Sequence, residues 1–157
     1  MEIDRRDVLK AGALAAVALV AGVVKPRSGM AQPTRAWNES AFSSKSLDEV
    51  VKALRGERPA QTTQIAWGVT PEIAENGAVV PISITSSIPK TELIAIVVEK
   101  NPNPLAAYFE LPPGTDPAIV TRVKMGQTSN VFAVVRADGK YFVASREIKV
   151  TLGGCGG

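Results

Sequence analysis

From Thr62 to Val150, apolar and polar residues alternate in short segments that are separated by turn residues. Alternation with a period of two is typical of strands that bury one face. The predicted strands are residues 63–68, 78–86, 92–99, 105–110, 117–125, 129–137 and 140–150. The strongest turn signal is Asp138-Gly139, because a type I′ hairpin needs positive φ at both central positions. The sequence therefore predicts an all-β fold, an immunoglobulin-like antiparallel β-sandwich.

One short helix is expected ahead of the strands, over residues 47–55. Ser46 and Glu49 have the spacing of a capping box, in which each side chain bonds the backbone N–H of the other residue. The apolar residues of this segment fall on one helical face: Leu47, Val50, Val51 and Leu54. Gly56 and Pro59 end the run. We expect the apolar face of this helix to dock onto a sheet.

Two predicted strands, residues 93–98 and 131–135, are apolar on both faces. In a two-layer sandwich the outer face of a strand normally meets water, so these strands need a cover. Either the amino-terminal helix or a second subunit could provide it. The sequence pattern favours neither.

The composition excludes several kinds of chemistry. The chain has one cysteine and no histidine, which excludes an internal disulfide, a Ser-His-Asp triad and a histidine-ligated zinc. We expect no cofactor, no metal and no catalytic residues. Basic residues gather in the last third of the sequence: Arg122, Lys124, Arg136, Lys140, Arg146 and Lys149. They form either a solvated strand face or an electropositive surface near the carboxyl end.

Residues 1–31 have the pattern of a cleaved export signal. Arg5 and Arg6 precede an apolar run over residues 11–24, which is too short to span a bilayer comfortably. Small residues then allow cleavage after Ala31. Paired arginines resemble a twin-arginine (Tat) signal, which exports folded cargo, so we expect a periplasmic protein without a membrane anchor after cleavage. An uncleaved signal anchor is the alternative.

Removal of this leader would lower the formal charge of the chain. It holds five of the 18 basic residues and three of the 15 acidic ones, so the net charge would fall from +3 to +1. A charge this small gives no reason to expect nucleic-acid binding. Residues 32–152 would then form the single folded domain.

The last five residues place the only cysteine between two pairs of glycines: Gly153, Gly154, Cys155, Gly156 and Gly157. Glycine restricts the backbone little and shields nothing, so we expect residues 153–157 to form a flexible arm with an exposed thiol. Such an arm cannot hold a base and an orienting group in place, which favours delivery of the thiol over local catalysis. The alternative is a frayed terminus with an incidental thiol.

Together these features resemble the SoxY family, the sulfur-carrier subunits of the periplasmic thiosulfate-oxidising (Sox) system. The resemblance runs from the twin-arginine leader to the last residue, and four motifs carry it: residues 75–81 (ENGAVVP), 101–104 (NPNP), 122–131 (RVKMGQTSNV) and 150–157 (VTLGGCGG). The family pattern has alanine where this chain has Gly126.

The resemblance implies a carrier that is not itself an enzyme. Cys155 would hold sulfur intermediates covalently, and a small β-protein, SoxZ, would pair with the chain as a heterodimer and share its export signal. A haem protein of SoxXA type would conjugate thiosulfate to the thiol, and a SoxB-type hydrolase would release sulfate. A sulfane dehydrogenase, in systems that contain one, would oxidise the remaining sulfur.

A second reading of the residues stays open. The chain could be a periplasmic immunoglobulin-like interaction module whose terminal cysteine forms an intermolecular disulfide, as unpaired thiols in oxidising compartments often do.

Overall fold

The computed structural model describes residues 38–151. Two helices and nine strands follow one another along this part of the chain: α2 (Glu39–Ser43), α3 (Leu47–Ala53), β1 (Ala60–Gln61), β2 (Ile65–Trp67), β3 (Ile73–Ala74), β4 (Val80–Ser86), β5 (Thr91–Val98), β6 (Leu105–Glu110), β7 (Ala118–Val123), β8 (Ser129–Ala137) and β9 (Lys140–Val150). The predicted export signal with Arg5, Arg6 and Ala31, and the predicted arm with Cys155, lie outside the described residues.

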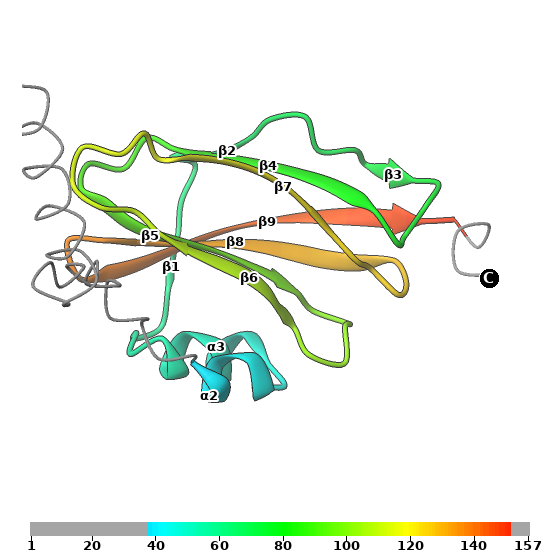
Figure 1. Ribbon diagram of the computed structural model, residues 1–157, viewed down its shortest axis with the longest axis horizontal. Helices are drawn as coiled ribbons and strands as arrows, with labels where there is room; N and C mark the ends of the chain where they lie inside the picture. The colour runs from blue at the N-terminus through cyan, green and yellow to red at the C-terminus, as the bar shows by residue number, and fades with distance from the viewer. Residues whose placement is uncertain (1–37, 152–157) are drawn as a thin grey trace, which may run out of the picture. The chain divides into compact units, whose positions relative to one another are not determined.

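The strands form two sheets that pack face to face (Figure 1). The larger sheet has the order β1-β9-β8-β5-β6, with β3 also pairing with β9, and the smaller has the order β2-β4-β7. The core between them is aliphatic, and Ile82, Ile96 and Val135 are among its fully buried residues. The immunoglobulin-like β-sandwich expected from the sequence is confirmed.

The two helices cover the other face of the larger sheet (Figure 1). Val50 and Val51 of α3 pack in a second buried cluster with Leu93 and Val97 of β5. Tyr141 of β9 joins this cluster and donates a hydrogen bond of 2.6 Å to the Leu54 carbonyl at the end of α3. The doubly apolar strands are therefore covered from within the chain, and their composition gives no support for a second subunit on this face.

The strand predictions hold within about two residues for every longer strand. Positive φ at both Asp138 (49°) and Gly139 (74°) confirms the predicted tight hairpin. The sequence did not reveal β1, β3 or α2. β1 and β3 each contribute two residues that pair with β9 in parallel, so the sheet is not wholly antiparallel. The short helix α2 is capped by the Asn38 side chain, which accepts a hydrogen bond from the Ala41 amide.

Candidate functional site

The predicted functional residues of the carboxyl end, Gly153, Gly154, Cys155, Gly156 and Gly157, begin two residues after the described part of the chain. That part ends at Thr151, where β9 leaves the sheet. The structure therefore describes the segment from which the predicted arm departs. We call residues 149–151 the root.

The root is hydrogen-bonded on both of its sides. On one side the Val150 amide donates a 3.0 Å hydrogen bond to the Thr128 hydroxyl, which continues the β8–β9 ladder past its last backbone pair, Ser129 and Ile148. On the other side, β3 pairs in parallel with Lys149 and Val150. The Thr151 amide reaches the Ala74 carbonyl at 3.1 Å. The backbone is thus fixed up to the last described residue.

Three loops lie at this end of the sandwich, and hydrogen bonds join them to each other. We call residues 75–79, 99–104 and 124–128 the root loops. Asn101 connects two of them: its amide nitrogen donates to the Lys124 carbonyl at 2.7 Å, and its amide oxygen accepts from the Gly126 N–H at 3.3 Å. The Met125 amide donates to the Gly77 carbonyl at 2.7 Å, which connects the third loop. The Met125 side chain is fully buried below them.

The distance from the root to the thiol has an upper bound set by covalent geometry. Cys155 lies four residues beyond Thr151. A fully extended chain spans at most about 3.6 Å per residue, so the Cα atom of Cys155 lies within roughly 14 Å of that of Thr151. Any protein that reacts with this thiol must approach the sandwich at the end where β9 stops.

The basic residues of the last third do not form a single surface near the root. Arg136 pairs with Glu92 at 2.9 Å, close to the opposite end of the sandwich, where Lys140 also begins β9. Arg146 donates to the Thr70 carbonyl at 3.0 Å and lies 5.5 Å from the centre of the Trp67 ring. The six basic residues are therefore distributed along the length of the sandwich, with the exposed Arg122, Lys124 and Lys149 at the root end.

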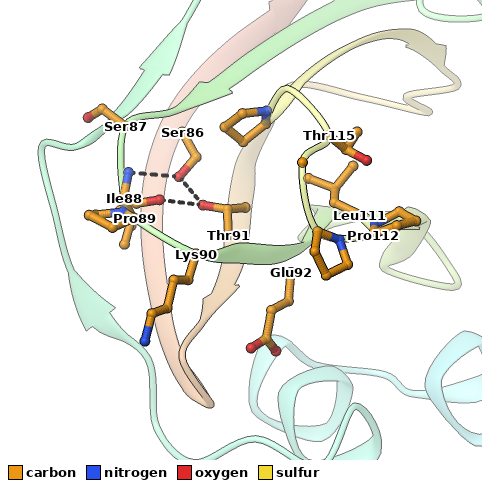
Figure 2. Close-up of a pocket in the computed structure, with 13 residues that line it drawn as sticks. Ser86, Ser87, Ile88, Pro89, Lys90, Thr91, Glu92, Leu111, Pro112 and Thr115 are labelled. Atoms are coloured by element: carbon orange, nitrogen blue, oxygen red, sulfur yellow. Dashed lines mark hydrogen bonds between the residues drawn. The ribbon is translucent and has the colours of Figure 1, made fainter.

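A hollow of about 550 Å³ opens at the opposite end of the sandwich, between the β4–β5 loop and the β6–β7 loop (Figure 2). Its wall holds a closed set of hydrogen bonds, in which the Ser86 and Thr91 hydroxyls contact each other and the Ile88 backbone. β9 runs from this end to the root over 11 residues, a length of roughly 33 Å at the rise of a strand. The hollow is out of reach of Cys155 of the same chain.

Within residues 38–151, no group of three His, Cys, Asp or Glu side chains is placed to hold a metal ion. No helix in this part of the chain is long and apolar enough to cross a membrane.

These features define a class, an immunoglobulin-like β-sandwich with a helical cover on one sheet and a carboxyl end that leaves from a fixed root. The family model described as "Sulfur oxidation protein SoxY" matches residues 51–155. The chain belongs to the SoxY family of sulfur carrier proteins in sulfur oxidation, whose members are generally non-catalytic. Membership implies partners from the Sox system.

A solved structure of the same family agrees with this assignment. The sulfur carrier protein SoxY from Chlorobium limicola f thiosulfatophilum is 40% identical with a TM-score of 0.61, and the match covers 68% of this chain and 97% of that one. Two structures of superoxide reductase (neelaredoxin) from Ignicoccus hospitalis are 17% and 16% identical, each with a TM-score of 0.49. These two matches cover 62% and 69% of this chain and 85% and 100% of theirs. No curated protein matches the sequence.

Proposed function

We propose that this chain carries sulfur intermediates of thiosulfate oxidation covalently on Cys155 and presents them in turn to partner enzymes. The observation that carries the proposal is the family match, which begins within α3, includes all nine strands that the structure describes and ends at Cys155 itself. The fixed root supports it, because the hydrogen bonds of Val150 and Thr151 make the body of the carrier rigid up to four residues from the thiol.

The loading step would join two sulfur atoms. The Cys155 thiolate and the sulfane sulfur of thiosulfate form an S–S bond, and the two electrons released pass to a haem protein of SoxXA type. Only the thiolate is nucleophilic, and a free cysteine has a reference pKa of about 8.5. The four glycines next to Cys155 offer no side chain that could lower this value, so we place the activation of the thiol in the cleft of the enzyme.

The release step would need water and no further oxidant. A SoxB-type hydrolase adds water to the terminal sulfonate, sulfate and protons leave, and a sulfur atom stays on the cysteine as a persulfide. A sulfane dehydrogenase, in systems that contain one, would oxidise that sulfur. Because the carbon–sulfur bond to the protein persists throughout, the intermediate cannot diffuse away between enzymes.

Export and pairing belong to the same proposal. Residues 1–31 would serve as the twin-arginine signal, with Arg5 and Arg6 as its recognition pair and cleavage after Ala31. The folded domain, residues 32–152, would reach the periplasm together with a SoxZ-like subunit. Support for that subunit comes from the family and from the pattern of the export signal. The doubly apolar strands give no support for it, because α2 and α3 already cover them.

The variant Cys155→Ser tests the covalent step. We expect it to fold and to pair with its partner subunit as the native chain does, but to take up no sulfur when it is incubated with thiosulfate and the haem enzyme. Intact-mass spectrometry reads the result directly, because each adduct changes the mass of the chain. Thiosulfate-dependent loading of the serine variant would contradict the proposal.

A further inference from the structure

The reach of the thiol restricts where an enzyme can dock. An enzyme that acts on Cys155 encloses the sulfur in a cleft. The rim of that cleft must therefore come closer to the root than the maximum distance of roughly 14 Å between Thr151 and Cys155. Two of the root loops border the root, because Thr128 contacts it directly and Ala74, bonded to Thr151, leads into residues 75–79. The third loop, residues 99–104, is joined to them through Asn101.

The root loops are fixed relative to one another before any partner arrives. The hydrogen bonds of Asn101 to Lys124 and Gly126, and that of Met125 to Gly77, join all three loops. Lys45 of the helical cover holds the loop 99–104 from its other side, through contacts of 3.0 Å with the Pro102 carbonyl and 2.8 Å with Asn103. A surface that is already ordered loses little conformational freedom on binding, which suits brief encounters with several enzymes.

The exposed residues of the root and the root loops include small, uncharged and charged side chains. Ala78, Gly126 and Gln127 are exposed, and Val79 is 50% exposed. The exposed charges are of both signs and nearly balance, with three positive and two negative side chains: Lys100, Lys124, Lys149, Glu75 and Glu99. A surface with charges of both signs fits an enzyme rim that also carries mixed charges better than a strongly acidic or strongly basic one.

We infer that the root loops form the docking surface for the enzyme that loads sulfur onto Cys155, with Gly126 at a position where that enzyme comes close. A Cβ atom placed on Gly126 has no other atom within 4 Å, so the space above this residue is open to solvent or to a partner. The inference rests on the proposed carrier function and adds to it the surface that the loading enzyme contacts.

The substitution Gly126→Arg tests this surface, because a long side chain there enters open space and does not disturb the core. With the purified haem enzyme and thiosulfate, we expect the KM for the carrier to rise by about tenfold or more, the effect of a lost contact worth about 1.4 kcal/mol. Alkylation of Cys155 by iodoacetamide should stay within about twofold of the native rate, since a reagent this small needs no docking surface.

Thr115→Arg is the matched control, because Thr115 is exposed in the β6–β7 loop at the opposite end of the sandwich. Its loading rate should equal that of the native chain. Gln127→Arg is a second test variant, in case Gly126→Arg lowers the melting temperature. A native KM in both root-loop variants, or an equal rise in Thr115→Arg, would overturn the docking surface and leave the carrier function standing. Failure of the native chain to load at all would overturn both.

Discussion

The Val150 amide donates a hydrogen bond of 3.0 Å to the hydroxyl of Thr128, one step beyond the last backbone pair of the β8–β9 ladder. The side chain of Thr128, the residue directly before β8, thus holds Val150, the last residue of β9. Together with the Thr151 to Ala74 hydrogen bond on the β3 side, it fixes where the chain leaves the sandwich.

Thr128→Val removes this acceptor but keeps the shape of the side chain. An amide that loses its partner in a partly buried place costs about 1 kcal/mol, so we expect a small loss of stability and faster hydrogen exchange at Val150 and Thr151. Urea unfolding and amide exchange measure the two effects. The control is Thr85→Val, an exposed position on β4. Native exchange rates at the root would contradict the role given to Thr128.

Tyr141→Phe tests how the helical cover is attached to the larger sheet. The variant leaves the buried Leu54 carbonyl without its 2.6 Å partner, which should lower the free energy of unfolding by about 1–3 kcal/mol. Tyr108→Phe is the control, because no hydrogen bond of the Tyr108 hydroxyl is found within residues 38–151; its effect should be smaller. Equal effects in thermal unfolding would show that the Tyr141 hydroxyl contributes nothing specific.

Two glycines in turns should respond to alanine in opposite directions. Gly126 has open space around it and no positive φ, so Gly126→Ala should stabilise the fold by about 0.4–1 kcal/mol, because it restricts the unfolded chain. Gly139 has a φ of 74°, where alanine is strained, so Gly139→Ala should cost about 1–2 kcal/mol. Urea unfolding measures the change in the free energy of unfolding of both variants. A change of the same sign in both would contradict this account of the two glycines.

Bulk beside the thiol should interfere with enzymes but not with small reagents. We expect Gly154→Phe and Gly156→Phe to slow loading by the haem enzyme, because a narrow cleft must admit the neighbours of Cys155 together with the sulfur. Alkylation by iodoacetamide should be unaffected. Normal turnover of these variants would show that the glycines are not needed for access to the cleft.

The sequence predicted the longer strands because a half-buried strand alternates visibly, and it predicted α3 from the Ser46–Glu49 capping box. The Glu49 amide donates to the Ser46 hydroxyl as expected, whereas the Glu49 carboxylate accepts from the Lys45 amide instead of that of Ser46. It could not predict β1 and β3, since two residues show no period. The five residues of α2 are likewise too few for a helical pattern.

For the site, local sequence could identify the cysteine motif but not the contacts of the root. These contacts depend on strand register, as when Thr151 meets Ala74 from far along the chain. The distribution of the basic residues depends on register in the same way. Positions close in sequence, such as Arg136 and Lys149, lie toward opposite ends of the β8–β9 hairpin.

The most direct test of the carrier function is the intact mass of the protein isolated from the periplasm of thiosulfate-grown cells, measured without and then with reductant. The proposal predicts a chain that begins near Gln32 and carries sulfur and sulfonate increments on Cys155, which reductant removes. A clean disulfide-linked dimer, or an unmodified thiol under every growth condition, would contradict it and favour a structural interaction module.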